Sequence, residues 1–339
     1  MRVFVTGGTG LIGRALIRKL LGRGDGVVVL SRSPEKARGL PALKGAEVVA
    51  GDPGKEGDWR RAVDGCDAVV NLVGHNIFDG RWTAEVKRTI RDSRVYATEH
   101  VVAAMNQAER RPGVLVNASA IGYYGPHGDE ELTEGSPSGS DFMAVVCREW
   151  EDATHPAAEH GARVALVRTG VVLARGEGAL GVMTPIFKYL PGGAAPVGGG
   201  GNPLAPGSGK QWMSWIHLDD IAGIFLTAID HPDARGPING TSPNPVRNAE
   251  FARVLARTLR KWGWTGLWPP FVPVGPPDVL LRLVLGEVAQ VVTEGQRVLP
   301  SKAQSLNYSF RFPDLESALA DLFGRLAPAP EPVATGAGH

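Results

Sequence analysis

The sequence predicts an α/β protein: a doubly wound parallel sheet followed by a smaller, mixed C-terminal domain. Three observations favour this fold. A short apolar strand, a glycine-rich turn and an amphipathic helix open the chain, and strand and helix patterns then alternate as far as residue 170. Such alternation is typical of parallel sheets. Beyond residue 170 the pattern is less regular, so we expect a dinucleotide-binding domain at 1–170 and a substrate-side domain at 171–325, with strands from 210–245 returning to the first.

The opening elements carry the first functional signal. The apolar run at 2–6 predicts a buried strand, and Gly7, Gly10 and Gly13 follow it, before apolar residues at helical spacing. In this position glycines let the backbone turn sharply and approach a pyrophosphate, while the helix N-terminus supplies free N–H groups and its dipole. The pattern predicts the start of a Rossmann-type nucleotide-binding unit, and an ordinary loop is the alternative.

The second strand, at 27–30, bears on the choice of cofactor. It is followed by Ser31, Arg32 and Ser33, without the acidic residue that an NAD-preferring site usually has here. A planar guanidinium and hydroxyl donors suit a 2′-phosphate, so we expect NADP(H). The alternative is a solvated arginine on a loop. Asp52, after the third strand at 46–50, is placed to reach the adenine edge.

The remaining elements of the first half continue the alternation. They are strands at 68–72, 114–117 and 164–167 and helices at 83–106 and 142–160. Gly74 follows the fourth strand, where we expect a close approach to the nicotinamide ribose. The apolar faces of these two long helices either pack internally in a monomer or pack against a second copy in a homodimer.

The second half predicts separate short elements. They are a glycine- and proline-rich loop at Gly192–Gly209, a strand at 212–216, and helices at 218–229, from the cap Asn248 to 262, at 276–285 and at 314–323. Residues 326–339 have almost nothing to bury, so we expect a disordered tail.

Composition excludes several function classes. Lys and Arg number 36 against 35 Asp and Glu, which gives a net charge of +1 and no electrostatic footprint for nucleic acid or an anionic membrane. No apolar run is long enough to span a membrane. Two cysteines cannot build a disulfide framework or a thiolate metal site, and the eight histidines lack metal-ligand spacing. We expect a cytoplasmic protein without a bound metal.

Three motifs carry a specific resemblance: Thr6–Gly13, Asn71–Gly74 and Ser119–Gly125. They resemble an extended short-chain dehydrogenase/reductase. More narrowly, the chain resembles the atypical NAD-dependent epimerase/dehydratase-like family with a small C-terminal domain of unknown function. The closer match extends over segments at 92–98, 142–151, 209–220, 236–245 and 295–300, so the resemblance covers about residues 1–325.

The resemblance implies NADP(H) binding on a Rossmann fold, with an unassigned substrate. The positions expected to contact the cofactor are Thr6, Gly7, Gly10, Leu11, Ile12, Gly13, Ser31, Arg32, Asp52, Leu72, Val73, Gly74 and Arg94.

The catalytic set of the wider superfamily is incomplete. That superfamily uses Ser or Thr with Tyr-x-x-x-Lys, in which the tyrosine exchanges a proton with the substrate oxygen during hydride transfer. None of the five tyrosines precedes a lysine at this spacing. The matching helix supplies neither a phenol nor an ammonium over residues 142–147. Arg148 and Glu151, further along it, fit a solvated helix pair.

Four residues are candidates for the missing chemistry. Ser119 provides a hydroxyl just past the fifth strand, or else a strand-end cap. Tyr123 and Tyr124 follow in the loop over the cofactor, where either phenol is a candidate acid or a packing residue. His217 is a further candidate proton donor, although its place before Asp219 favours a structural role.

The substrate side departs from the sugar-nucleotide pattern. Extended relatives of that type place an asparagine three residues after the arginine that follows strand six. Here that arginine is Arg168, and the position three residues after it is Val171. Arg168, Lys210 and Gln211 remain candidates for an anionic or polar group. Trp212 is a candidate aromatic wall, with core packing as its alternative.

These patterns support three hypotheses. The first is an NADP(H)-dependent oxidoreductase acting on a small carbonyl or hydroxyl substrate with an unusual proton donor. The second is an NADP(H)-binding sensor or scaffold that has lost turnover. The third is a sugar-nucleotide epimerase or dehydratase.

Overall fold

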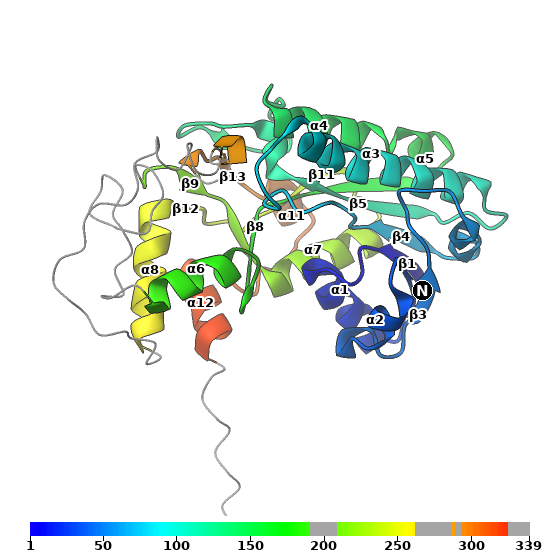
Figure 1. The fold of residues 1–339 in the computed structure, drawn as a ribbon, viewed down its shortest axis with the longest axis horizontal. Helices are drawn as coiled ribbons and strands as arrows, with labels where there is room; N and C mark the ends of the chain where they lie inside the picture. The colour runs from blue at the N-terminus through cyan, green and yellow to red at the C-terminus, as the bar shows by residue number, and fades with distance from the viewer. Residues whose placement is uncertain (190–208, 262–285, 289, 291–292, 325–339) are drawn as a thin grey trace, which may run out of the picture.

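The computed structural model describes residues 1–189, 209–261, 286–288, 290 and 293–324. Seven parallel strands form its central sheet, in the order β3-β2-β1-β4-β5-β7-β11, and helices cover both faces (Figure 1). The strand order reverses between β1 and β4, so a ligand crevice is expected where the carboxyl ends of these two strands diverge. The predicted doubly wound α/β fold is confirmed.

Seven strands form the sheet: the inner ones are mostly apolar, β-branched segments buried on both sides, whereas the edge strand β3 is only partly buried and the edge strand β11 has the sequence Gly-Pro-Ile-Asn-Gly. They are β1 (Arg2–Thr6), β2 (Gly26–Ser31), β3 (Glu47–Ala50), β4 (Ala68–Asn71), β5 (Val114–Ala120), β7 (Arg163–Thr169) and β11 (Gly236–Gly240). Asn71 pairs in register with Thr6 on one side and with Asn117 on the other. Polar side chains of three adjacent strands therefore lie in one row near the carboxyl edge.

Two groups of helices pack on opposite faces of the sheet. They are α1 (Leu11–Gly22) and α7 (Leu218–Asp230) on one face, and α3 (Ala84–Gln107), α4 (Phe142–Asp152) and α5 (His155–Glu159) on the other. Leu16 and Ile17 of α1 are fully buried. Burial of each such side chain contributes about 1.5–3 kcal/mol. Shorter helices are α2 (Pro34–Arg38) and the 3₁₀ turns Pro41–Leu43, Asp58–Val63, Ile121–Tyr124 and Gly286–Val288.

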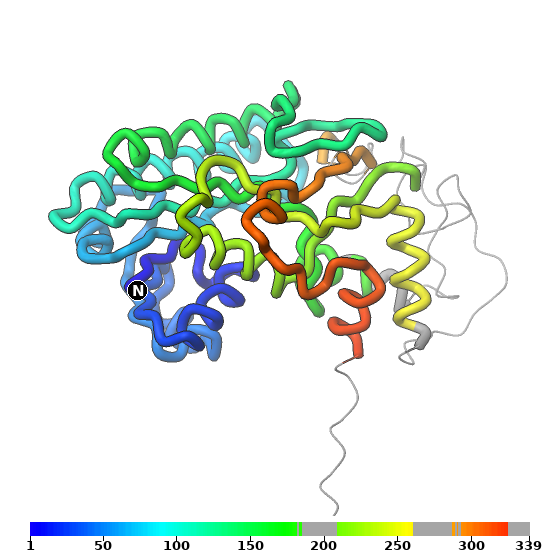
Figure 2. The backbone as a smooth tube through the Cα atoms, turned by 180° about the vertical axis from the view of Figure 1, so that it is seen from behind, coloured from blue at the N-terminus to red at the C-terminus, as the bar shows by residue number. Residues whose placement is uncertain are grey.

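A second core lies beyond β7 and β11. Its elements are the strand pairs β8 (Val171–Ala174) with β10 (Trp215–His217) and β9 (Trp212–Met213) with β12 (Val246–Arg247), and the helices α6 (Gly178–Tyr189), α8 (Asn248–Lys261) and α12 (Leu315–Gly324). Two elements lie outside it: the strand pair β6 (Glu131–Leu132) with β13 (Arg297–Val298) forms a small cluster with Tyr124, and α11 (Ser301–Ser305) packs against β11 in the main core. Trp215, Phe251 and Phe323 are buried at the centre of the second core. Figure 2 shows this C-terminal part beside the sheet rather than over it.

Several predicted boundaries differ from the structure. The helix expected at 142–160 is divided into α4 and α5, because Pro156 fits the first turn of α5, which begins at His155, but would break a helix that continued from α4. The strand expected at 212–216 is divided between two small sheets. Asn248 is the first residue of α8, and its side-chain oxygen accepts no hydrogen bond from the described residues, so the predicted cap is wrong.

Three further predictions concern residues without a described structure. The helix at 276–285, the tail at 326–339 and positions 192–208 of the glycine-rich loop lie outside the described residues.

Candidate functional site

The turn between β1 and α1 has the geometry of a phosphate cradle. Gly7 has φ +67°, which favours glycine, and its carbonyl accepts a hydrogen bond from Gly10 N at 3.0 Å. A Cβ on Gly13 would lie 2.5 Å from that same carbonyl oxygen. Across the described chain, the N–H groups of Leu11, Ile12 and Gly13 donate to no protein acceptor, and no acidic residue occupies this first helical turn. These open donors fit a phosphate.

The end of β2 presents a cation. Arg32 is exposed and makes no ion pair or hydrogen bond with any described residue. Ser31 is buried, and its Oγ accepts a hydrogen bond from Ser33 N at 3.1 Å, which shapes the backbone on either side of Arg32. Asp52 Oδ1 accepts from Gly54 N at 3.0 Å in the turn after β3. Arg32 is therefore available to a 2′-phosphate.

A buried amide network lies under the crevice. Thr6 Oγ1 donates to Asn71 Oδ1 at 2.6 Å, and Asn71 Nδ2 donates to Asn117 Oδ1 at 2.7 Å and to Thr98 Oγ1 at 2.9 Å. Trp150 Nε1 also donates to Thr98 Oγ1, at 3.0 Å. The network ties three strands to α3 and α4. The side chain of Thr6, expected at the cofactor, instead points into this network and is fully buried.

The backbone after β4 closes against the phosphate turn. A Cβ on Gly7 would lie 2.7 Å from the carbonyl carbon of Leu72, and Leu72 N donates to Thr6 O at 3.2 Å. Val73 N lies 3.5 Å from Asn71 Oδ1. The structure thus brings these sequence-predicted cofactor positions together along one edge.

Gly74 makes room for an arginine. A Cβ on Gly74 would lie 3.0 Å from Arg94 Cζ, because the guanidinium fills the space beside this glycine. Arg94 donates to Ile90 O at 2.9 Å and to His75 O at 3.0 Å, and its guanidinium faces the ring of Trp150 at 5.2 Å. The sequence interpretation of Gly74 as a direct cofactor contact is therefore incomplete, since its first neighbour is Arg94.

Ser119 belongs to a buried ion-pair network. It lies within β5, not past it, and its Oγ donates to Glu151 Oε1 at 2.6 Å. Glu151 also receives two hydrogen bonds from Arg168, each of 2.8 Å. The sequence suggested that Glu151 forms a solvated pair with Arg148, and this prediction is wrong because Glu151 is buried and bonded to Ser119 and Arg168. Arg168 is not open to substrate either, because its side chain is only 4% exposed.

The two adjacent tyrosines have different environments. Tyr124 is buried, donates to Asn239 Oδ1 at 2.7 Å and accepts from Arg168 Nη1 at 3.0 Å. Burial raises the pKa of its phenol. The guanidinium carbon Cζ of Arg168 lies over the ring of Tyr123, 3.4 Å from its centroid. The Tyr123 hydroxyl makes no hydrogen bond with the described residues. Tyr123 is half-buried, and of the two phenols only its hydroxyl is left without a hydrogen-bond partner in the described residues.

The side chain of His217 is buried beside the second core, where protein groups surround both ring nitrogens. Its Nδ1 accepts a hydrogen bond from Asp219 N at 3.0 Å, which caps α7, and its ring contacts Phe312 at 4.0 Å between centroids. Nε2 lies 3.6 Å from Asp321. Burial lowers the pKa of this imidazole. Because these contacts explain the side chain, we leave His217 out of the proposed site.

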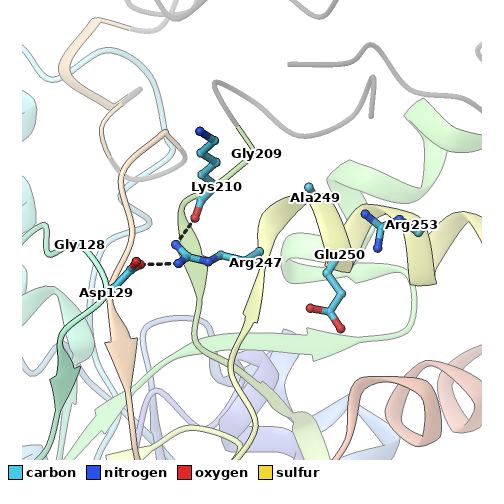
Figure 3. A pocket seen from close by; sticks show the side chains of 8 residues that line it. All are labelled: Gly128, Asp129, Gly209, Lys210, Arg247, Ala249, Glu250 and Arg253. Carbon is cyan, nitrogen blue, oxygen red and sulfur yellow. Dashed lines mark hydrogen bonds and ion pairs between the residues drawn. The ribbon is translucent and has the colours of Figure 1, made fainter. Parts of the chain in front are cut away.

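A separate pocket of about 620 Å³ is lined by the segments that precede β6 and β9, by β12 and by the start of α8. Figure 3 shows Asp129, Lys210 and Arg247 on one side of it and Glu250 and Arg253 on the other. Arg247 forms an ion pair with Asp129 and donates to the carbonyl of Lys210. The pocket has both charge signs, so its charge alone does not define a ligand.

Trp212 lies at the border of this pocket. Its ring is covered by the guanidinium groups of Arg247 at 4.1 Å and Arg297 at 4.8 Å, and its Nε1 donates to Asp129 at 2.9 Å. Gln211 accepts a hydrogen bond from Asn248 N through its carbonyl. The sequence did not point to Asp129, Arg247 or Arg297, because nothing in their local sequence marks them and only the fold brings them to Trp212.

The described residues lack two further features. No helix there is long and apolar enough to cross a bilayer. No group of three or more His, Cys, Asp or Glu side chains is arranged to hold a metal ion in that same part of the chain.

Fold and turn together define a dinucleotide-binding α/β protein of the extended short-chain dehydrogenase/reductase type. Comparison with protein families agrees: the NAD dependent epimerase/dehydratase family matches residues 3–239, and a domain of unknown function (DUF1731) matches residues 276–322. The chain belongs to the NAD dependent epimerase/dehydratase family, and the resemblance found in the sequence is confirmed.

Known relatives cover almost the whole chain. The epimerase family protein SDR39U1 homolog, chloroplastic, of Arabidopsis thaliana is 43% identical over 322 residues, which cover 94% of this chain and 86% of that protein. Epimerase family protein YfhF of Bacillus subtilis is 33% identical, covering 95% of this chain and 98% of that protein.

Solved structures agree with the fold. Human epimerase family protein SDR39U1 (isoform2), crystallised with NADPH, superposes with a TM-score of 0.79 at 32% identity, covering 96% of this chain and all of that one. MoeE5 in complex with UDP-glucose and NAD superposes with a TM-score of 0.72 at 19% identity, over 96% of this chain and 98% of that one. The second likeness shows the fold alone.

Proposed function

We propose that this protein is an NADP(H)-dependent oxidoreductase that acts on a small carbonyl or hydroxyl substrate. The observation that carries the proposal is the cofactor-side geometry: among the described residues, the N–H groups of Leu11–Gly13 form a cradle without protein acceptors, and Arg32, after the next strand, has no ion-pair partner. The human relative crystallised with NADPH supports the choice of cofactor. In this proposal residues 1–170 hold the dinucleotide and residues 171–325 form most of the substrate side.

The nicotinamide, when bound, supplies or accepts the hydride. The chain then has to bind the dinucleotide, orient the substrate and move one proton. The α1 N-terminus holds the pyrophosphate and Arg32 the 2′-phosphate. Tyr123 is the proposed proton donor, because its hydroxyl is open while Arg168 and the packing of the turn fix its ring.

Cofactor binding is tested by fluorescence titration of the purified protein with NADPH and NADH. We expect tighter binding of NADPH, and equal affinities would contradict the NADP(H) assignment. Turnover is tested by following NADPH oxidation across a panel of aldehydes, ketones and quinones. Consumption that depends on both substrate and protein supports the oxidoreductase.

A second candidate, an NADP(H)-binding sensor or scaffold, is favoured by three observations at the catalytic positions. Ser119 directs its proton to Glu151, Tyr124 is buried, and α4 presents Met143 and Cys147 rather than a phenol or an ammonium. NADPH binding without turnover on the whole panel would support this candidate. The sugar-nucleotide epimerase is disfavoured on the substrate side, since Arg168 is enclosed by its own ion pair.

A further inference from the structure

An ion pair joins the phosphate turn to a segment that is distant in the sequence. Arg14, in α1, donates from Nη1 to Thr9 O at 3.0 Å and from Nη2 to Glu177 Oε2 at 2.5 Å. Thr9 belongs to the turn between β1 and α1, whereas Glu177 follows Arg14 by 163 residues and lies between β8 and α6. One guanidinium therefore bridges the cofactor cradle and a carboxylate of the proposed substrate side.

The segment that carries Glu177 is a tight hairpin between β8 and α6. An antiparallel backbone bridge between Ala174 and Glu177 closes it, and Gly178, the next residue, has φ +57°. A Cβ on Gly178 would lie 3.4 Å from Leu11 Cδ2, so the hairpin contacts the first residue of α1. Because β8 and α6 contribute side chains to the second core, the hairpin brings that core against the cradle.

The carboxylate of Glu177 is unfavourable to a phosphate bound in the cradle. The first turn of α1 contains no acidic residue, and the N–H groups of Leu11–Gly13 have no protein acceptor in the described chain. Glu177 adds a negative charge beside this anion-binding turn, with Arg14 between them. A pyrophosphate that enters the turn meets this charge and competes with it for the same guanidinium.

The exchange of partners favours the phosphate. The side chain of Arg14 is 26% exposed and that of Glu177 is 52% exposed, so water and salt screen their attraction, and exposed ion pairs of this kind contribute little to stability. A guanidinium binds phosphate oxygens through parallel charge-assisted hydrogen bonds, which are about twice as strong as neutral ones. Arg14 can therefore leave Glu177 at small cost and gain a stronger partner.

We propose that Glu177 is an internal competitor of the cofactor: it holds Arg14 until the pyrophosphate of NADP(H) takes its place. The exchange frees the hairpin from α1, so that occupancy of the cradle is communicated to β8 and α6 on the substrate side. The cofactor binds the released state better and thereby shifts the population toward it. This inference rests on the proposed NADP(H) function.

NADPH affinity in a double-variant cycle tests the competition. NADPH is titrated by fluorescence into the wild-type protein, Glu177→Gln, Arg14→Gln and the double variant. We expect Glu177→Gln to tighten binding about two- to fivefold, since fivefold corresponds to the roughly 1 kcal/mol that an exposed ion pair can contribute. Arg14→Gln should weaken binding about tenfold, because the pyrophosphate loses a charge-assisted contact. In the Arg14→Gln background the gain from Glu177→Gln should fall below about twofold, since no cation is left to release.

Three results of this cycle would overturn the proposal. Weaker binding in Glu177→Gln would show that the ion pair holds the hairpin closed over the cofactor, and unchanged binding would show that it does not oppose the cofactor. An equal gain in both backgrounds would show that Glu177 repels the phosphate independently of Arg14. Asp230→Asn is the matched control, because it removes a half-exposed carboxylate paired with Arg23 at the other end of α1, about 18 Å away, and should leave NADPH affinity unchanged.

Hydrogen exchange of the hairpin tests its release. With NADPH bound, the amides of residues 174–178 in the wild-type protein should exchange faster than in the free protein, because release opens the backbone bridge. In Glu177→Gln they should exchange fast with and without NADPH. Slower or unchanged exchange in the wild-type protein with NADPH would overturn the release. Failure of the wild-type protein to bind NADPH would instead reject the proposed function itself.

Discussion

Glu151 of α4 and Arg168 of β7 form a bidentate ion pair, with two N–O distances of 2.8 Å and both side chains less than a tenth exposed. The pair joins α4 to β7, the strand that lies beside β5 in the sheet. Ser119, Tyr123 and Tyr124 all contact it. Three of the four residues first selected as chemical candidates are therefore organised around a structural ion pair, and among these three only Tyr123 has a hydroxyl without a hydrogen-bond partner in the described residues.

Breaking this ion pair from one side should be costly. Glu151→Gln leaves the buried Arg168 guanidinium without a charge partner, and we expect the free energy of unfolding to fall by about 3–5 kcal/mol in urea denaturation. Glu149→Gln removes the exposed pair with Arg91 and should cost at most about 1 kcal/mol. If Glu151→Gln lowered the free energy of unfolding by less than about 1 kcal/mol, the pair would not hold α4 to the sheet.

The adjacent tyrosines should separate activity from stability. With any substrate found in the panel, Tyr123→Phe is expected to lower kcat by at least about 10²-fold, because it removes the proton donor, with little change in unfolding. Tyr124→Phe should instead cost about 1–3 kcal/mol of stability, since Asn239 Oδ1 loses its buried donor. Full activity of Tyr123→Phe would move the proton donor elsewhere.

The cofactor half of the site could be predicted from the sequence because its signals are local. Gly7, Gly10 and Gly13 lie within a few residues of one another, and Arg32 directly follows a strand, so spacing alone places them. The fold class follows from the same periodic pattern.

The rest of the site depends on contacts between distant segments. Ser119 and Arg168 meet Glu151 only after two strands and a helix have packed, and the choice between a solvated and a buried Glu151 cannot be read from its neighbours in sequence. Arg94 is similar: its position against Gly74 is set by the crossing of α3 over the end of β4. The roles of Ser119 and Arg168, which differ from those expected from the family pattern, therefore follow from these tertiary contacts.

Arg32 should determine cofactor preference. Arg32→Ala removes a charge-assisted contact to the 2′-phosphate, so we expect NADPH affinity to fall about 10- to 100-fold and NADH affinity to change little, measured by fluorescence titration. Arg38→Ala, which removes the nearby cation paired with Glu35, is the control and should leave both affinities unchanged. Equal losses for the two cofactors in Arg32→Ala would refute the specificity role.

His217 should make stability depend on pH in the acidic range. Burial lowers the pKa of the folded imidazole, while the unfolded one titrates near 6.5, so below that pH the unfolded chain binds the extra proton. The free energy of unfolding should then decrease as pH falls below about 6.5, by at most about 1.4 kcal/mol per pH unit from this group. Urea denaturation at pH 5–8 measures it. His217→Asn keeps an acceptor for the α7 cap without titrating, and parallel curves for both proteins would contradict the prediction.

Gly74→Ala should act on the cofactor through Arg94. The backbone of Gly74 is not in the left-handed region, so alanine fits it locally, but the new Cβ would lie 3.0 Å from Arg94 Cζ and Nη2. The guanidinium must move, and its hydrogen bond to His75 O holds it to the same loop. We therefore expect NADPH affinity to fall by about tenfold in fluorescence titration, because Arg94 is one of the positions expected to contact the cofactor. Binding of 2′,5′-ADP, which lacks the nicotinamide half of NADP(H), should stay unchanged.

The double variant decides whether this loss passes through Arg94. If it does, Gly74→Ala should have no further effect in an Arg94→Gln background, since the displaced charge is already absent and the two losses are not additive. Gly22→Ala is the matched control, because a Cβ there meets no atom within 4 Å. Additive losses in the double variant would mean that Gly74 contacts the cofactor directly, as the sequence first suggested, and that the space beside it is not reserved for the arginine.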